Sequence, residues 1–147
     1  VVHDPIKNEL FFAEKGSGAW MNETRLRVSG RNRMIEAVFA TGLPFASRAD
    51  LPASLRDLGR LLPVCAGVRQ SGSAALDLSY VAAGRFDGFW ERRLNVWDLA
   101  AGLIILREAG GLASPINESL DILGDGQIIC SNEPLYETFL AAVRNAA

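Results

Sequence analysis

The 147-residue sequence has one histidine and two cysteines, and this scarcity excludes several kinds of site. With His3 as its only histidine, the chain cannot build a multi-histidine metal site or a histidine-based nucleophile triad. Cys65 and Cys130 lie in apolar segments, without CxxC spacing or a neighbouring histidine. We therefore expect two buried free thiols, a pattern that favours a reducing, cytoplasmic location.

Long apolar runs and clustered positive charge are also missing. The longest apolar stretches, such as residues 99–106, are much shorter than the roughly 20 residues that span a bilayer. No charged and then apolar leader is visible. Lysine and arginine are spread along the chain and the net charge is −2, so there is no basic stripe to neutralise nucleic-acid phosphates. We expect neither a membrane nor a nucleic acid as a partner.

Hydrophobic patterning predicts an α/β protein. Apolar residues recur with helical spacing at 51–62, 74–83, 98–109 and 133–143, where we expect helices. Short apolar segments bounded by turn residues predict strands at 1–3, 10–13, 35–41, 64–68, 86–91 and 127–130. Strands that alternate with helices favour a layered α/β architecture, and no repeat, low-complexity tract or linker divides the chain.

The length and the hydrophobic content of 49% allow one domain at most. The sequence opens on Val1 and Val2 without an initiator methionine, within what reads as a buried strand. We therefore expect residues 1–147 to form either a single domain or part of a longer chain whose other strands complete the sheet.

The most informative motif runs from Trp97 to Gly102 as Trp-Asp-Leu-Ala-Ala-Gly and is followed by Glu-Ala-Gly-Gly at 108–111. An acidic residue, Asp98, opens an apolar helical run, small residues allow another backbone to approach its first turn, and a glycine pair ends it. Asp98 is then either the N-cap of a buried helix or a carboxylate fixed beside a site. Periodicity alone favours the cap.

Two other segments carry candidate binding residues. Gly72, Ser73 and Ala74 fall where a strand gives way to a helix, so free backbone N–H groups and the Ser73 hydroxyl are available to a polyol hydroxyl or an anion. The alternative is that Ser73 only caps the helix. Glu91 ends a predicted strand, where a glutamate is usually just solvated.

Aromatic and acidic residues elsewhere are expected to be structural. Trp20, Trp90 and Trp97 each lie in an apolar segment without interleaved basic residues, which favours core anchors over a stacking platform. Glu108, near the end of its predicted helix, is interpreted as structural.

Four ordered blocks resemble the inositol monophosphatase family. The Trp97 motif and its Glu-Ala-Gly-Gly partner are similar to the family's C-terminal signature, and residues 1–20 resemble its central hairpin and Lys-Gly-x-Gly-Ala turn. Residues 69–77 resemble the Arg-x-x-Gly-Ser/Thr-Ala-Ala substrate loop, and residues 84–91 resemble the strand that bears a substrate-binding glutamate. The resemblance covers essentially the whole chain.

The resemblance implies a role for each candidate residue. It implies that Asp98 is a ligand of catalytic Mg²⁺ and that Gly72, Ser73 and Ala74 contact the substrate. In the family, a glutamate seven residues before the metal-binding aspartate accepts hydrogen bonds from substrate hydroxyls, and Glu91 has that spacing from Asp98. It also implies a homodimer and a layered α-β-α-β-α fold, of which this chain supplies the second sheet and its covering helices.

The family's first signature, Asp-Pro-Leu/Ile-Asp-Gly-Thr, is missing, together with an upstream glutamate that supplies further metal ligands. Asp4, Pro5 and Ile6 imitate its beginning, but Lys7 stands where its second aspartate would fall, and a hairpin turn is favoured instead. The chain therefore resembles the C-terminal half of a phosphatase, and its main catalytic residues are not identified here.

The expected function is that of a Mg²⁺-dependent phosphomonoesterase similar to inositol-1-monophosphatase. Its substrate would be inositol monophosphate or a similar small polyol phosphate, and its activity would require the N-terminal half. Alternatives are a phosphatase for sugar bisphosphates or bisphosphate nucleotides, or a non-catalytic interaction module.

Overall fold

The computed structural model describes residues 1–43 and 51–144, which form two β-sheets with helices between and beside them. The first sheet is antiparallel and has the strand order β1-β2-β3-β4. Its strands are β1 (Val2–Asp4), β2 (Glu9–Glu14), β3 (Gly18–Met21) and β4 (Thr24–Arg25). The predicted hairpin is confirmed, and Asp4 Oδ1 closes its turn by accepting hydrogen bonds from the backbone N–H groups of Ile6 and Lys7 at 3.0 and 3.1 Å.

The second sheet is mixed and has the order β6-β5-β7-β9-β8. Its strands are β5 (Val38–Thr41), β6 (Gly67–Arg69), β7 (Gly88–Glu91), β8 (Leu112–Ser114) and β9 (Ile128–Ser131). Strand β5 runs parallel to both β6 and β7, whereas β9 pairs antiparallel with β7 and β8. The central strands are buried, so this sheet is covered on both faces.

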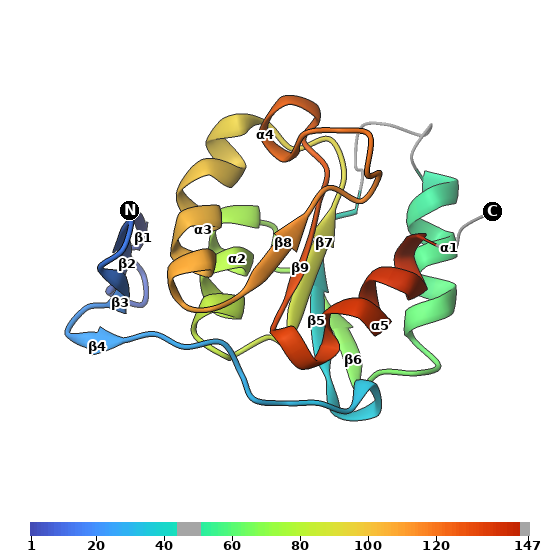
Figure 1. Cartoon of the computed structure of the whole chain (residues 1–147), viewed down its shortest axis with the longest axis horizontal. Helices are drawn as coiled ribbons and strands as arrows, with labels where there is room; N and C mark the ends of the chain where they lie inside the picture. Colours follow the sequence, from blue (N-terminus) through green and yellow to red (C-terminus); the bar gives the residue numbers. More distant parts are fainter. Residues whose placement is uncertain (44–50, 145–147) are drawn as a thin grey trace.

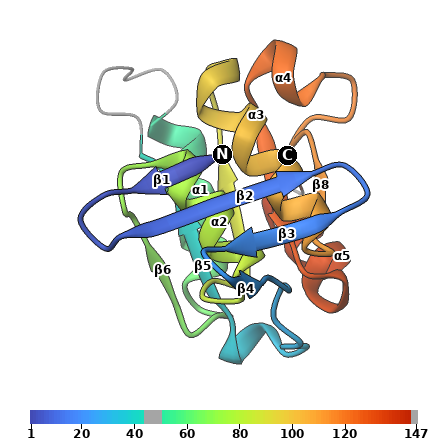
Figure 2. The same cartoon turned by 90° about the vertical axis from the view of Figure 1, so that its left-hand side faces the viewer.

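The helices occupy two layers. They are α1 (Leu51–Leu61), α2 (Ala74–Ala82), α3 (Val96–Glu108), α4 (Ile122–Asp125) and α5 (Glu133–Arg144), with a 3₁₀ turn η1 (Met34–Glu36). Helices α2 and α3 lie between the two sheets, and α1 and α5 cover the far face of the second sheet (Figure 1). Figure 2 shows the first sheet crossing in front of α2 and α3. This layering confirms the expected α/β fold class.

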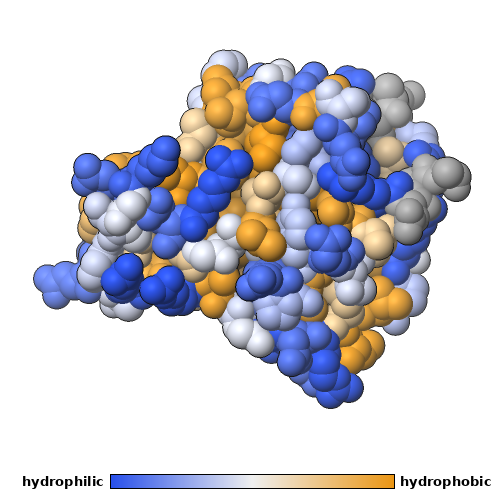
Figure 3. Space-filling view, in the orientation of Figure 1, coloured by the Kyte–Doolittle hydropathy of each residue, from blue (hydrophilic) through white to orange (hydrophobic). Residues whose placement is uncertain are grey.

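Three apolar clusters fill the spaces between the layers. One packs Phe39 and Trp90 of the second sheet against Phe139 of α5. A second joins the opposite face of that sheet to α2 and α3. A third buries Phe11 of the first sheet against the same two helices. On the face shown in Figure 3, apolar side chains occur in patches separated by polar ones. Among the described residues, no helix has the length and apolar content needed to cross a bilayer.

Several predictions about single residues are now resolved. Cys65 and Cys130 are free and buried, as expected. Glu108 is structural, since its carboxylate accepts hydrogen bonds from Gly16 N–H and Gly18 N–H at 2.9 Å each. The prediction for Trp97 is wrong: its side chain is 74% exposed, because it lies on the face of α3 opposite the buried leucines. Trp90 is a core residue, as expected.

Candidate functional site

The predicted site residues meet in one pocket of about 280 Å³. Its floor lies at the carboxyl ends of β5 and β7, the edge at which ligands commonly bind in α/β sheets. The starts of α2 and α3 form two of its sides, and Leu43 and Leu94 add apolar surface. The sequence-predicted residues that line it are Gly72, Ser73, Ala74, Glu91 and Asp98. They come from three separate segments, so the fold is what brings them together.

The Gly72–Ala74 turn joins β6 to the start of α2. Gly72 has φ +88°, a left-handed backbone conformation that glycine adopts most readily. Ser73 is the N-cap of α2, and its Oγ accepts a hydrogen bond from Leu76 N–H at 3.4 Å. Ser73 therefore caps α2, as the capping interpretation predicts. Its hydroxyl hydrogen can still be donated to a ligand, so a capping role and a binding role are compatible.

The first turn of α2 supplies further donors. Ala74 and Ala75 are the first two residues of this helix, and both line the pocket. Backbone N–H groups at the first positions of a helix have no acceptor within the helix, and they attract oxygen atoms that carry negative charge. This side of the pocket is therefore suited to a phosphoryl or hydroxyl oxygen.

Asp98 lies at the start of α3, but the interpretation of it as an N-cap is wrong. The cap is Asn95, and the helix begins at Val96, so Asp98 is its third residue. Asp98 Oδ2 accepts a hydrogen bond from Asn95 N–H at 3.0 Å, the reciprocal contact of a capping box. Asparagine is itself a preferred cap, which explains the earlier start of the helix. Asp98 is half-buried and also lines the pocket.

Glu91 ends β7 at the floor of the pocket, where it is half-buried rather than solvated. Its carboxylate lies directly over Gly42, where a Cβ atom would come within 2.0 Å of Oε1. Burial, together with the negative charges of Asp77 and Asp98, raises the pKa of Glu91 to about 7. The side chain is thus held in the pocket by close packing and is protonated over part of the neutral pH range.

Asp77 is a pocket residue that sequence reasoning did not select. It is 1% exposed on α2, and its Oδ1 accepts a hydrogen bond from Ser71 Oγ at 2.7 Å. Burial raises the pKa of Asp77 to about 6. The available signal was its position four residues after Ser73, because residues four apart lie on the same face of a helix. A lone acid in an apolar helix carries no motif, so this signal was weak.

The acidic residues bear on whether a cation fits here. Asp77, Glu91 and Asp98 line the same pocket and make it unfavourable to an anion unless a cation balances them. Asp98 presents a carboxylate oxygen, the hard donor that Mg²⁺ prefers. Within residues 1–43 and 51–144, however, no three Asp, Glu, His or Cys side chains lie close enough to hold a metal ion. Asp98 therefore fits as one ligand of a site that these residues do not complete.

Comparison with known proteins gives one consistent result. The family model described as the inositol monophosphatase family matches residues 1–147. The chain is 44% identical over 144 residues to an inositol-1-monophosphatase of Mesorhizobium japonicum, covering 98% of this chain and 54% of that protein. It is 43% identical over 145 residues to the Nus factor SuhB of Escherichia coli, covering 99% of this chain and 54% of that protein.

The fold comparison agrees with the sequence comparison. The crystal structure of the extragenic suppressor protein suhB from Bartonella henselae superposes with a TM-score of 0.93 at 43% identity, covering 99% of this chain and 56% of that one. The chain thus spans about half the length of the relatives that it matches.

Proposed function

Because this chain belongs to the inositol monophosphatase family, we propose that residues 1–147 are the C-terminal half-domain of a Mg²⁺-dependent phosphomonoesterase. The observation that carries the proposal is the convergence of the predicted residues from three segments on one pocket at the ends of β5 and β7. A chance arrangement of a cap, a strand end and a turn would not place all of them around the same cavity.

Each residue has a role that suits its surroundings. Asp98 would hold one Mg²⁺, and Mg²⁺ in such sites neutralises phosphoryl charge and activates water. The Ser73 hydroxyl and the N–H groups at the start of α2 bind and orient oxygen atoms of the substrate. Glu91, held against Gly42, accepts hydrogen bonds from substrate hydroxyls. Leu43 and Leu94 contact the carbon skeleton and exclude water from it.

The proposed substrate is inositol monophosphate or a similar small polyol phosphate. A pocket of about 280 Å³ suits a small molecule, and the carboxylate of Glu91 suits one with several hydroxyl groups. The three carboxylates of the pocket disfavour a second phosphate, which makes sugar bisphosphates and bisphosphate nucleotides the weaker candidates. By resemblance to the family, the proposal includes a homodimer, and the two buried free thiols favour a cytoplasmic location.

A non-catalytic interaction module is the second candidate. It is favoured by the relatives named Nus factor SuhB and by the incomplete set of metal ligands among the described residues. Phosphatase activity that depends on Asp98, in a protein of the relatives' length, would speak for the enzyme. Its absence in that protein would speak for the module.

Glu91→Gln tests the assignment of the substrate. In a protein of the relatives' length that contains these residues, we expect kcat/KM for inositol 1-phosphate to fall by roughly ten- to hundredfold, because a hydrogen bond to a charged group is worth about 1.5–3 kcal/mol. Hydrolysis of a simple aryl phosphate, which lacks the hydroxyls, is expected to change little. Steady-state phosphate release on both substrates is the measurement.

Glu137→Gln is a matched control, since Glu137 is exposed on α5. It is expected to leave both substrates unaffected. Equal losses on the two substrates in Glu91→Gln would move Glu91 from substrate recognition to the metal site or the fold.

A further inference from the structure

Asp77 is a buried carboxylate without a cationic partner. In the part of the chain that the structure describes, the Ser71 hydroxyl is its one side-chain hydrogen-bond donor, and no lysine or arginine pairs with it. Burying a carboxylate in this way costs stability, and the raised pKa of Asp77 reflects that cost. Stability therefore does not explain why an aspartate stands at this position, whereas its place in the lining of the pocket suits a role in binding.

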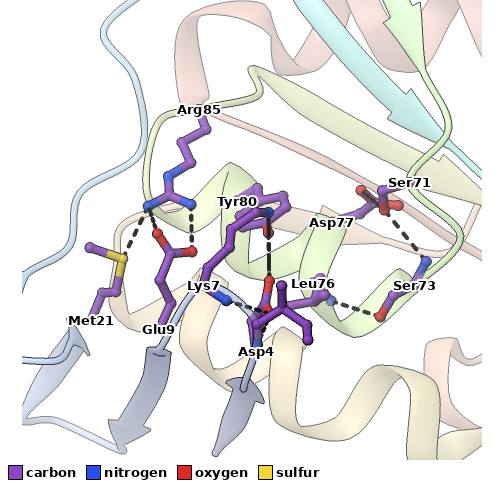
Figure 4. Close-up of polar contacts among 11 residues, drawn as sticks. Asp4, Lys7, Glu9, Met21, Ser71, Ser73, Leu76, Asp77, Tyr80 and Arg85 are labelled. Carbon is purple, nitrogen blue, oxygen red and sulfur yellow. Dashed lines mark hydrogen bonds and ion pairs between the residues drawn. The ribbon is translucent and has the colours of Figure 1, made fainter.

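A chain of hydrogen bonds leads from Asp77 to the pocket turn (Figure 4). Ser71 Oγ donates to Asp77 Oδ1 at 2.7 Å and accepts from Ser73 N–H at 3.4 Å. Ser73 O in turn accepts from Asp77 N–H at 2.9 Å, which closes the loop. This backbone bond is the first of α2 and any residue at position 77 would make it, so the side chain of Asp77 supplies the link to Ser71.

The ionised carboxylate fixes the direction of these bonds. A carboxylate can only accept, so the single hydrogen of the Ser71 hydroxyl is committed to Asp77. The lone pairs of Ser71 Oγ are then left for Ser73 N–H. With no acceptor at position 77, the Ser71 hydroxyl would be free to rotate, and this second bond would lose its preferred geometry.

Apart from the cap bond from Leu76 N–H to Ser73 Oγ, the turn has little support from the described residues. Ser71 and Gly72 are both exposed, and a Cβ atom added at Gly72 would meet nothing within 4 Å. Gly72 also gives the backbone more conformational freedom than other residues would. Order in the turn thus depends on the Ser73 cap and on the Ser71 bond that Asp77 anchors.

We propose that Asp77 is a positioning residue: through the Ser71 hydroxyl, it fixes the turn that presents Ser73 to the pocket before a ligand binds. The proposal deepens the proposed function, because it rests on that pocket being the binding site for a phosphate ester. A turn that is ordered beforehand lowers the entropy cost of binding, so its loss raises KM more than it lowers kcat.

Ser71→Ala separates positioning from other roles of Asp77. Asp77 also faces the negative charges of Glu91 on β7 and Asp98 on α3, so a change at Asp77 alters the electrostatics of the pocket as well. Ser71→Ala keeps the carboxyl group of Asp77 and removes the link to the turn. Because the bond from Ser71 lowers the pKa of Asp77, the variants are compared at about pH 8, where the carboxyl group is ionised in both. Ser79→Ala is the matched control, because Ser79 lies on the same helix and its hydroxyl bonds to Ala75 O, away from the turn.

The first measurement uses the 147-residue chain and needs no activity. Amide hydrogen exchange, followed by NMR, is expected to accelerate about tenfold at Ser73 N–H and Leu76 N–H in both Ser71→Ala and Asp77→Ala, and to be unchanged in Ser79→Ala. Unchanged exchange in Ser71→Ala would overturn the proposal, even if Asp77→Ala failed to fold.

The second measurement is kinetic and uses a protein of the relatives' length. We expect KM for inositol 1-phosphate to rise about tenfold in Ser71→Ala and in Asp77→Ala, with kcat within about twofold, and the double variant to be no worse than either single one. Additive effects, or a loss confined to kcat, would overturn the positioning role. A wild-type protein with no phosphatase activity would refute the proposed function, while the exchange data would still decide whether Asp77 orders the turn.

Discussion

The side chain of Asp98 has two roles, one in the cap of α3 and one in the pocket. One carboxylate oxygen completes the capping box of α3 with Asn95 N–H, and the residue as a whole lines the pocket. A cap needs only an acceptor oxygen, whereas a cation needs the negative charge. An amide side chain in its place retains the acceptor and loses the charge, so the two roles can be separated by one substitution.

Asp98→Asn is expected to reduce turnover by at least about a hundredfold in a protein of the relatives' length, because charge stabilisation dominates phosphoryl transfer. The melting temperature is expected to change little, because the amide oxygen can still accept from Asn95 N–H. The measurements are kcat at saturating Mg²⁺ and the melting temperature by circular dichroism, made on the same protein. Asp121→Asn, at the N-cap of α4, is the matched control, and its activity is expected to match wild type. A rate within about threefold of wild type, under about 1 kcal/mol of barrier, would leave Asp98 as a capping residue only.

The raised pKa values of Glu91 and Asp77 predict a pH-dependent stability. The pKa of Glu91 is about 7 in the folded chain and 4.5 when the group is exposed. The pKa of Asp77 is about 6 in the folded chain and 3.8 when the group is exposed. Between these values the folded chain binds more protons than the unfolded chain, so the free energy of unfolding that these groups contribute falls as pH rises. Their contribution is fully present below about pH 4 and is lost by about pH 7.

Glu91→Gln is therefore expected to become more stable relative to wild type as pH rises from 4 to 8, by on the order of 2 kcal/mol for a half-buried group. Urea unfolding of the 147-residue chain at a series of pH values measures the difference. Parallel curves for wild type and variant would show that Glu91 has an ordinary pKa in the folded chain.

The residues that could be predicted from sequence are those with fixed spacing in a motif. Asp98, Glu91 and the Ser73 turn belong to such motifs, and the structure brings them together. Asp77 could not be selected, because the desolvation that makes it unusual comes from α2 packing between two sheets. Trp97 was misassigned because residue type does not reveal which face of a helix is turned to solvent.

At the level of elements, the close packing of α2 on α3 sets the walls of the pocket. A Cβ atom at Gly102 would lie 2.7 Å from both Cβ and Cδ1 of Leu78, so the two helices approach where α3 has no side chain. The small residues after Asp98 were expected to let another backbone approach the first turn of α3, but the structure places the Leu78 side chain against Gly102, in the second turn. Since each helix carries pocket residues near its start, their separation also fixes the width of the site.

Gly102→Ala is expected to destabilise the chain by about 1–3 kcal/mol through overpacking against Leu78. Gly59→Ala is the matched control: Gly59 is exposed on α1 with nothing within 4 Å of an added Cβ, so the same change is expected to stabilise by about 0.5–1 kcal/mol. Urea unfolding measures the change in the free energy of unfolding of each variant, which is expected to be a decrease for Gly102→Ala and an increase for Gly59→Ala. A stable Gly102→Ala variant would mean that α2 and α3 can move apart at little cost.

Element length decides how much of the fold could be predicted. Helices α1, α2, α3 and α5 have 9 to 13 residues, enough for the 3.6-residue period to appear, and their predicted ends agree to within about two residues. Strands β3, β4 and β8 and helix α4 have two to four residues, too few for a pattern, and were missed. The predicted strand at 35–41 begins only at Val38, because residues 34–36 form the 3₁₀ turn η1.

At the level of the whole molecule, the pocket is acidic while its proposed substrate is an anion. Three carboxylates line it, and the helix N-termini offset them only in part. Phosphate binding therefore requires cations, and the described residues offer Asp98 without a complete ligand set. The relatives are about twice as long as this chain. We place the remaining metal ligands in the part of such a protein that this chain does not span.

The 147-residue chain alone is accordingly expected to show no Mg²⁺-dependent release of phosphate from inositol 1-phosphate. One carboxylate cannot satisfy the near-octahedral oxygen coordination of Mg²⁺, so no metal-activated water can form at a useful rate. The assay covers a range of Mg²⁺ concentrations, with a protein of the relatives' length as the positive control and its Asp98→Asn variant as the negative one. The chain must also be shown to be folded, by the slow amide exchange of its buried strands, so that inactivity is not a result of unfolding. Turnover by the chain alone at the rate of the longer protein would mean that residues 1–147 hold a complete catalytic site, and the role given to Asp98 as one ligand among several would be wrong.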